Sequence, residues 1–389
     1  MINVTKAYLP SKRKYQDYID KIFQTGWLTN NGQLLKTLES RLAEHLGVKH
    51  LICVANGSLA LQLAYKALEL KGEVITTPFS FVATTSTLSW EGLIPIFADI
   101  DPNSFNINPA NIEPLITDKT SAIVPVHVFG NPCQVEAIGA IADKHNLNVV
   151  YDAAHAFDTR YTDKDGHSQS VLNYGNISTI SFHATKLFHT IEGGAVITND
   201  DDLAKKIRTL INFGITGLTS IEGLGTNAKM NEFEAAMGLC LLDDIDYIKT
   251  ERKRIWDNYH DEFIDLLELQ NWNPQSLNNH AYAPVLFSSE TDLLKAERVL
   301  NENNIMPRRY FYPSLDTLNY LNPKNPENTI SGSSQTTTCP NVRKRSKHDQ
   351  FCGHSRRIAS RILCLPIYPG LKKCEQRKVI DIIKGCLDE

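Results

Sequence analysis

Residues 178–196 read Ser-Thr-Ile-Ser-Phe-His-Ala-Thr-Lys-Leu-Phe-His-Thr-Ile-Glu-Gly-Gly-Ala-Val, and the rest of the chain is organised around them. The apolar run 177–182 predicts a strand, a short polar turn carries Lys186, and a glycine pair opens a second apolar run at 195–198. A lysine between two buried strands is poorly solvated, which lowers the pKa of its ammonium group. Lys186 is therefore a candidate for the neutral amine that forms Schiff bases with aldehydes and ketones. The alternative is an ordinary solvated lysine in a loop.

The composition is that of a folded, soluble protein. Of 389 residues, 42% are hydrophobic and 22% are charged, and the formal net charge is -4. This balance gives no general attraction to nucleic acid or to an anionic membrane. No apolar stretch reaches the length of a membrane span, and the N-terminus lacks a signal-peptide segment. We therefore expect a cytoplasmic protein without nucleic-acid or membrane partners.

The eight cysteines are scattered along the chain without a CxxC pair. In a reducing compartment this pattern indicates free thiols rather than a disulfide or zinc framework. Cys339, His348, Cys352 and His354 could in principle bind a metal, but their spacing fits no standard site. We expect no metal.

Short apolar strands alternate with helices through most of the first 200 residues. Strands are predicted at 51–55, 73–77, 95–99, 121–126, 148–152, 177–182 and 195–199. Helices are predicted between most of them, including 82–91, 134–145 and 201–212. This order predicts the α/β class, with a largely parallel sheet covered on both faces. Ligands of such sheets bind where strands run out into loops.

The remainder of the chain predicts a smaller domain. One long helical pattern runs from about Asn227 to about Leu267, a length suited to a link between domains. Beyond it, strands are predicted at 283–287 and 307–311, with a helix at 291–303. We expect a large cofactor-binding domain over 1–247 and a small α+β domain over 248–389.

Residues 322–357 have a different composition. Pro, Asn, Ser, Thr and Gly dominate the first half, and Lys and Arg cluster in the second, within 342–357. We expect a long irregular loop. Its basic residues favour a solvated surface, and the alternative is a contact with a nucleotide diphosphate.

Two motifs suggest a site for a phosphorylated pyridine ring near Lys186. Residues 56–60, Asn-Gly-Ser-Leu-Ala, stand between a strand and a helix, where Gly57, Ser58 and the helix N-terminus form an anion site or simply a turn. Asp152 ends a predicted strand, and a buried carboxylate there needs a cationic partner such as a protonated pyridine nitrogen. The alternative for Asp152 is a helix N-cap.

Two further side chains complete the constellation. Phe81 could stack on a flat heterocycle, although an aromatic residue there is more often part of a core. Ser181 places a hydroxyl near Lys186, or is a satisfied buried hydroxyl. Phosphate cradle, aromatic ring, carboxylate, serine and lysine together are typical of a pyridoxal 5'-phosphate enzyme.

The chain resembles the sugar aminotransferases of the DegT/DnrJ/EryC1/StrS family from about Tyr15 to the C-terminus. The matching motifs include Gly26-Trp-Leu-Thr, Ala55-Asn-Gly-Ser-Leu-Ala, Thr77-Pro-Phe-Ser-Phe-Val-Ala-Thr, Asp152-Ala-Ala-His, Ser181-Phe-His-Ala-Thr-Lys, Glu192-Gly-Gly-Ala, Asn227-Ala-Lys-Met-Asn-Glu and Leu365-Pro-Ile-Tyr-Pro-Gly. The resemblance implies a fold-type I, aspartate aminotransferase-like pyridoxal 5'-phosphate enzyme. It looks most like members that aminate C4 of dTDP-4-keto-6-deoxyglucose with L-glutamate, giving dTDP-4-amino-4,6-dideoxyglucose for surface polysaccharide.

The resemblance also assigns roles to the motif residues. Lys186 becomes the Schiff-base lysine and proton shuttle, and Asp152 becomes the partner of the pyridine nitrogen. The remaining cofactor contacts implied are Gly57, Ser58 and Ser181 at the phosphate, Phe81 on the ring, and Asn227 at the phosphate of the neighbouring subunit. The resemblance therefore implies a homodimer with shared active sites.

Three positions are less closely specified by the resemblance. His155 stands where many members have glutamine near the cofactor's 3-hydroxyl. His183 faces the sugar or merely packs, and we favour the sugar because the turn is polar on both sides. Tyr312 is a further candidate for a substrate contact.

Rival functions stay open at this point. The same fold could aminate a 3-keto sugar or a UDP-sugar, or give the galacto epimer. It could also act as a dehydratase, but dehydratase relatives carry histidine in place of the Schiff-base lysine, and Lys186 argues against that. A non-catalytic regulator that keeps the cofactor is the third possibility. Loss of the cofactor's absorbance band on adding glutamate distinguishes an enzyme from a regulator.

Overall fold

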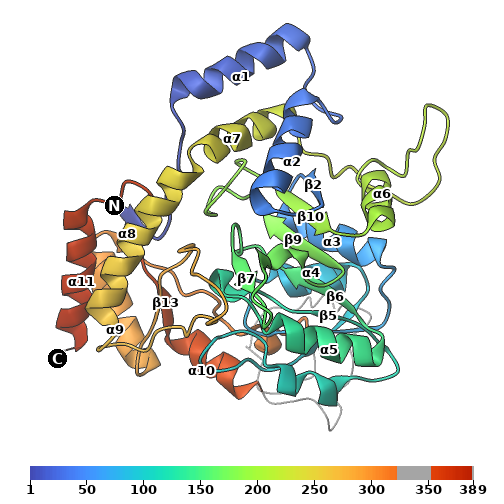
Figure 1. The fold of residues 1–389 in the computed structure, drawn as a ribbon. Helices are drawn as coiled ribbons and strands as arrows, with labels where there is room; N and C mark the ends of the chain where they lie inside the picture. The colour runs from blue at the N-terminus through green and yellow to red at the C-terminus, as the bar shows by residue number, and fades with distance from the viewer. Residues whose placement is uncertain (322–351, 388–389) are drawn as a thin grey trace, which may run out of the picture.

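A seven-stranded sheet forms the centre of the computed structural model, which describes residues 1–321 and 352–387 (Figure 1). The strands in spatial order are β2 (His50–Val54), β10 (Gly194–Thr198), β9 (Ile177–Ser181), β6 (Asn148–Asp152), β5 (Thr120–Val124), β3 (Glu73–Thr76) and β4 (Ile94–Phe97). Strand β10 runs antiparallel to both of its neighbours, and the other pairs are parallel. The prediction of an α/β fold with a mainly parallel sheet is confirmed.

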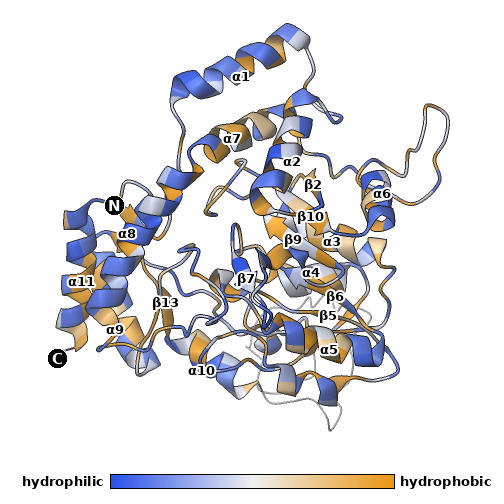
Figure 2. Cartoon of the chain, in the orientation of Figure 1, coloured by the Kyte–Doolittle hydropathy of each residue, from blue (hydrophilic) through white to orange (hydrophobic). Residues whose placement is uncertain are grey.

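Helices cover both faces of this sheet because successive strand residues point to opposite sides. Ile52 of β2 packs in one apolar layer and its neighbour Leu51 packs in the other. The helices that contribute to the first layer are α3 (Gly57–Ala67), α4 (Ala83–Trp90) and α6 (Asp201–Leu210). Those of the second include α2 (Gln33–Leu46), α5 (Val135–His145) and α7 (Glu232–Asp243). Figure 2 shows the apolar strands between helices with polar outer sides.

Six of the seven strands bring their carboxyl ends to one edge of the sheet, and β2, β6 and β9 are three of them. Strands β6 and β9 are parallel, and β2 runs in the same direction because β10 is antiparallel to both β9 and β2. The loop 182–193 turns from β9 into β10 at this edge and carries Lys186. Helix α3 begins beside it, directly after β2. The sheet topology therefore gathers the predicted site residues.

A second apolar core lies among later elements. It includes Ile255 and Phe263 of α8 (Ile245–Phe263), together with buried residues of other helices and strands. Those elements include β11 (Pro284–Leu286), α9 (Glu290–Glu302), β13 (Ile362–Cys364) and α11 (Lys373–Leu387). The division of the chain at 247/248 stays a prediction, and it falls inside α8.

The predicted long helix at 227–267 is wrong in one respect, because the structure has two helices there. Helix α7 ends at Asp243, and Asp244 has φ -102 and ψ 6 before α8 begins. The carboxylate of Asp244 accepts hydrogen bonds from Tyr8 Oη and Lys14 Nζ. The break therefore coincides with contacts to the N-terminal segment.

The predicted strand at 307–311 is also wrong. The strand of this region is β12 (Ile305–Met306), which pairs with β1 (Ile2–Asn3). Tyr310 and Phe311 are both buried, which the alternation of a half-buried strand does not allow. Arg308 forms only an isolated bridge with Cys364.

Part of the predicted loop at 322–357 is helical. Helix α10 (Gly353–Arg361) begins within it, and the carboxylate of Asp99 accepts hydrogen bonds from the amides of His354 and Ser355 in its first turn. Residues 322–351, which include Cys339 and His348, lie outside the described residues. The structure also contains a hairpin that the sequence did not predict, β7 (Arg160–Thr162) with β8 (Ser168–Ser170).

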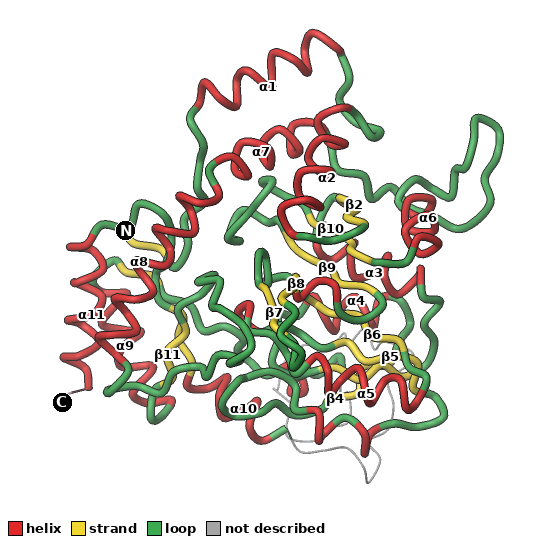
Figure 3. The backbone as a smooth tube through the Cα atoms, viewed as in Figure 1, coloured by secondary structure: helices red, strands yellow, loops and turns green. Residues whose placement is uncertain are grey.

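Two segments stand away from the sheet (Figure 3). Helix α1 (Lys12–Thr25) packs against α7, and the loop between α6 and α7 projects from the body of the molecule. Within the two described ranges, no helix is long and apolar enough to cross a membrane.

Candidate active site

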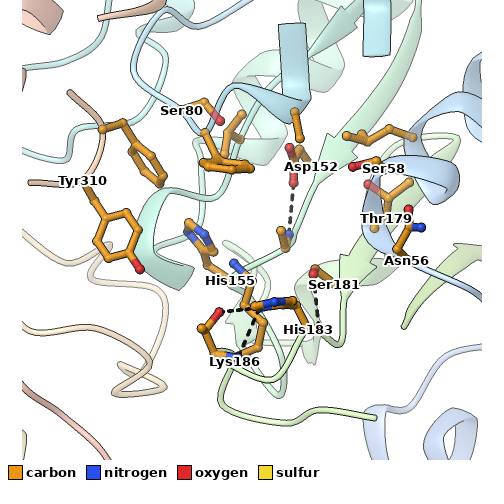
Figure 4. A pocket seen from close by; sticks show the side chains of 18 of the residues that line it. Asn56, Ser58, Ser80, Asp152, His155, Thr179, Ser181, His183, Lys186 and Tyr310 are labelled. Carbon is orange, nitrogen blue, oxygen red and sulfur yellow. Dashed lines mark hydrogen bonds between the residues drawn. The ribbon is translucent and has the colours of Figure 1, made fainter. Parts of the chain in front are cut away.

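A cavity of about 270 Å³ opens at the edge of the sheet where β2, β6 and β9 end (Figure 4). Its walls come from the start of α3, from the ends of β6 and β9, and from residues near 81 and 310. Most of the predicted site residues line this cavity, namely Gly57, Ser58, Phe81, Asp152, His155, Ser181, His183 and Lys186. The fold therefore brings together predicted residues that are up to 129 positions apart, from Gly57 to Lys186.

Lys186 lies in the turn after β9, and burial lowers the pKa of its amine to about 8. The negative charge of Asp152 opposes this shift and the positive charge of Arg308 adds to it. The Nζ of Lys186 donates a hydrogen bond to the Oη of Tyr282 over 3.3 Å. The lowered pKa and this hydrogen bond favour a desolvated lysine over a solvated loop residue, and the Schiff-base role of Lys186 stays a prediction.

Asp152 is the last residue of β6 and is buried. Its Oδ2 accepts a hydrogen bond from Thr84 Oγ1 at 2.8 Å, and its Oδ1 accepts one from the amide of Ala154 at 3.1 Å. Burial nevertheless raises the pKa of this carboxyl, and within the described residues no basic side chain forms an ion pair with it. No helix begins here, so the N-cap alternative is wrong. A cationic group of a ligand would meet an unpaired carboxylate.

The start of α3 forms a cradle next to β9. Asn56 caps the helix, since its Oδ1 accepts from the amide of Leu59 at 2.9 Å. The amides of Gly57 and Ser58 are in the first turn, where a helix supplies no partners, so they suit a phosphate. A Cβ added at Gly57 would lie 2.9 Å from the Cβ of Ser181. Glycine therefore permits the close approach of helix and strand that puts the serine hydroxyl beside these amides.

Phe81 and His155 present two rings to the cavity. Phe81 is 50% exposed, so the alternative of a core residue is wrong. His155 is buried, and burial holds its pKa well below the ordinary value, which keeps the ring neutral. The amide of Phe129 donates to Nδ1 of His155 at 3.2 Å. The hydrogen of the neutral ring is therefore on Nε2, which makes that nitrogen a donor.

His183 lies at the mouth of the cavity beside an acidic side chain. Its Nε2 is 3.6 Å from Glu192 Oε1, and its Nδ1 is 2.8 Å from the hydroxyl of Thr185. Both His183 and Glu192 are substantially exposed. This pair can therefore reach a polar substrate.

Two predicted residues do not line the cavity. Asn227 is exposed and forms an isolated bridge with Asn212. Tyr312 is 50% exposed, and the guanidinium of Arg309 lies 3.7 Å from its ring centroid. The aromatic side chains that do line the cavity from this segment are Tyr310 and Phe311. A substrate contact by Tyr312 therefore stays a prediction.

Three important side chains were missed by the sequence reasoning. Thr84 ends the quoted motif 77–84, so its place in a polar motif was an available signal. Arg308 lines the cavity but belongs to a segment that was predicted to be a strand. Tyr282 contacts Lys186 from far along the chain, and no local pattern marks it.

Comparisons with known proteins agree with this geometry. The model of the DegT/DnrJ/EryC1/StrS aminotransferase family matches residues 11–384. The chain belongs to this family. The aminotransferase is 40% identical to a Shigella dysenteriae protein named dTDP-4-amino-4,6-dideoxy-D-glucose transaminase, over 98% of both chains. It is 35% identical to an Escherichia coli protein of the same name, over 99% of this chain and 98% of that one.

Solved structures give the same result. DesI, crystallised in the presence of its TDP-sugar product, superposes with a TM-score of 0.86 at 32% identity, over 99% of this chain and 93% of its own. A Bacillus subtilis protein, NtdA, solved with bound cofactor PMP, has a TM-score of 0.80 at 25% identity over 97% of this chain and 82% of its own. The aminotransferase is thus a pyridoxal phosphate-dependent enzyme of the nucleotide-sugar class.

The residues of the cavity fit this cofactor. The α3 cradle has free amides for a phosphate, the unpaired Asp152 carboxylate suits a protonated ring nitrogen, and the amine of Lys186 suits an aldehyde. His155 offers an Nε2–H donor and Phe81 an exposed ring.

Proposed function

We propose that this enzyme transfers the amino group of L-glutamate to C4 of dTDP-4-dehydro-6-deoxy-D-glucose, giving dTDP-4-amino-4,6-dideoxy-D-glucose and 2-oxoglutarate. The observation that carries the proposal is the 40% identity, over 98% of both chains, to a transaminase of that name. The lysine, carboxylate and anion cradle in one cavity support it. The product would serve the synthesis of surface polysaccharide such as O-antigen, and the enzyme would act in the cytoplasm.

Pyridoxal phosphate supplies a ring that accepts the electrons of a carbanion next to nitrogen. Around it, the chain's own residues bind and move protons. The amine of Lys186, with its lowered pKa, takes a proton from carbon in one half of the reaction and returns one to the sugar carbon in the other. Asp152, oriented by Thr84 and the amide of Ala154, would hold the ring nitrogen's proton.

The cavity also suits anionic substrates. Arg308 lines it and is exposed, and no carboxylate of the described residues forms an ion pair with this guanidinium. An unpaired guanidinium binds carboxylate or phosphate oxygens well. Both L-glutamate and a nucleotide diphosphate carry such groups, so Arg308 supports the proposed pair of substrates.

A homodimer with shared active sites is part of the proposal. Large apolar side chains are exposed on α1, the segment after it and the projecting α6–α7 loop, including Trp27, Leu28, Leu218, Ile221 and Leu224. Exposed apolar side chains in such numbers favour a covered surface. Asn227 lies on the same projecting loop and does not line the cavity of its own chain. This placement supports a role for Asn227 in the active site of a second subunit.

The experiment is incubation of the enzyme with L-glutamate and a panel of dTDP- and UDP-linked 4-keto and 3-keto sugars, followed by NMR of the products. We expect amination of dTDP-4-dehydro-6-deoxy-D-glucose and formation of 2-oxoglutarate. Lys186→Ala is the control, since it should still bind the cofactor but turn over none of these sugars. Amination of a UDP-sugar or a 3-keto sugar alone would favour the rival regiochemistry. A glutamate-insensitive absorbance band would favour a cofactor-binding regulator.

A further inference from the structure

Tyr282 contacts the lysine of the active site from outside the cavity. It precedes β11 and is 6% exposed. Its Oη accepts the hydrogen bond from Lys186 Nζ at 3.3 Å, and its ring centroid is 4.6 Å from that of His155. The residues that line the cavity do not include Tyr282. This tyrosine can therefore act on Lys186 without touching the substrate.

A buried arginine holds the backbone next to this tyrosine. Arg252 of α8 is 2% exposed, and its Nη1 donates to the carbonyl oxygen of Ala281 over 3.0 Å. Its Nε has no hydrogen-bond partner, and no carboxylate in the described ranges pairs with it. Burying a charge without a counterion costs free energy of folding. A buried, unpaired arginine in this position therefore suggests that Arg252 has a functional role. The charge of Arg252 acts on Tyr282, since it opposes the rise that burial causes in the pKa of the tyrosine.

The tyrosine hydroxyl can serve both protonation states of the lysine. When Lys186 is an ammonium it donates and Oη accepts, and when it is a neutral amine the hydroxyl can donate to its nitrogen. A single neighbour can thus keep the amine in place before and after a proton moves.

We propose that Tyr282 is the positioning residue of Lys186, holding its amine at one place in the cavity whenever that amine is not linked to the cofactor, and that Arg252 fixes Tyr282 through the Ala281 backbone. The inference rests on the proposed function for its catalytic consequence. Its physical part concerns the lysine alone, so it can be tested on protein without cofactor.

The kinetic test is Tyr282→Phe, which keeps the ring and removes the hydroxyl. We expect kcat to fall about tenfold, the usual effect of losing one hydrogen bond to a charged group, with KM for both substrates unchanged. Tyr259→Phe is the matched control, because Tyr259 is a buried tyrosine whose Oη has no partner among the described residues. That variant should keep the wild-type kcat.

A second measurement follows Lys186 without the cofactor. The apoprotein is acetylated with trace acetic anhydride over a pH series, and mass spectrometry gives the pKa of Lys186 from its labelling. Tyr282→Phe should lower that pKa, since the bond that the hydroxyl accepts from the ammonium is charge-assisted and stronger than the one it donates to the neutral amine. The charged or titratable groups facing the lysine and tyrosine, all unchanged in the variant, are Asp152, His155, Arg252, Arg308, Tyr310 and Cys364.

The outcomes separate the inference from its rivals. A wild-type kcat together with a wild-type labelling pKa in Tyr282→Phe overturns it, and so does a rise in KM with kcat unchanged, which would indicate a substrate contact. Arg252→Lys keeps the charge but alters the bond to Ala281, and we expect a smaller loss of kcat in the same direction. If the wild type aminates no nucleotide sugar, the proposed function fails while the labelling series still decides this inference.

Discussion

The hydroxyl of Thr84 donates to the Oδ2 of Asp152 over 2.8 Å, so the first turn of α4 orients the carboxylate at the end of β6. The amide of Ala154 holds the other oxygen. Two neutral donors cannot neutralise a buried carboxylate, and burial keeps the pKa of Asp152 raised. A cation that binds here is therefore attracted by a carboxylate whose orientation is already fixed by two hydrogen bonds.

Asp152→Asn should reduce kcat by about 100-fold or more, since loss of one preorganised electrostatic group typically costs about 2.7–4 kcal/mol of transition-state stabilisation. Thr84→Val should have a smaller effect of about tenfold, because it removes a hydrogen bond but leaves the charge. Thr84→Ser keeps the hydroxyl and is the control. Steady-state kinetics with the sugar and glutamate measures all three. A wild-type kcat in Asp152→Asn would exclude the assigned role.

Gly57→Ala should weaken cofactor binding, because the new Cβ would lie 2.9 Å from the Cβ of Ser181 and force the cradle apart. Gly139→Ala is the matched control. It is also a helical glycine, in α5, with nothing within 4 Å of an added Cβ, and it should raise stability by about 0.5–1 kcal/mol. Equilibrium titration of the apoproteins with pyridoxal phosphate compares their affinities, and urea denaturation their stabilities. Equal cofactor affinity in the two variants would show that the cradle does not need glycine.

Mixed dimers test the shared site. When Lys186→Ala and Asn227→Ala chains are mixed, half of the sites in each hybrid dimer should be intact, so activity should rise above that of either variant. A mixture of Lys186→Ala with Asp152→Asn is the control. Both of those residues line the same cavity of one chain, so no hybrid restores a site. Absence of rescue in the first mixture, with subunit exchange demonstrated by mass spectrometry, would place Asn227 outside the partner's site.

The site residues that end or follow predicted strands could be predicted from the sequence. The residues that reach the site through packing of distant segments could not. Ser181 and Asp152 end apolar strands and Lys186 follows in the turn after β9, and strand ends of a parallel sheet meet at one edge. Tyr282 and Arg308 reach the same place through packing between distant segments, which leaves no periodic signal. The same holds for the hydrogen bond that fixes the His155 tautomer, whose donor lies 26 residues away.

Errors in the fold have similar causes. The apolar pattern across α7 and α8 continues through Asp244, so periodicity alone predicted one helix. Tyr310 and Phe311 are both buried because the chain turns toward the cavity at this point. The sequence pattern over 307–311 predicts a strand, whereas residues 310 and 311 form a turn. Each error reflects a tertiary contact that overrides a local preference.

The position of the new amine is the most specific prediction. With dTDP-4-dehydro-6-deoxy-D-glucose the nitrogen should be at C4, because the ketone carbon must come within bonding distance of the amine that the cofactor carries. His183 stands beside Lys186 at the mouth of the cavity, with Glu192 3.6 Å away, so polar groups are present to hold the sugar in one orientation. Amination of a 3-keto isomer, with no product from the 4-keto sugar, would contradict both the position and the epimer.

The product should also be the gluco epimer, with an equatorial amine. The face of the sugar that Lys186 meets receives the proton, and the amine is left on the other side, so a flipped sugar would give the galacto epimer. Proton NMR distinguishes the two. An equatorial amine leaves H4 axial, with two large couplings to H3 and H5, whereas an axial amine leaves only small ones. Small couplings would show that the sugar binds with its opposite face toward Lys186, while the assignment of nitrogen to C4 would stand.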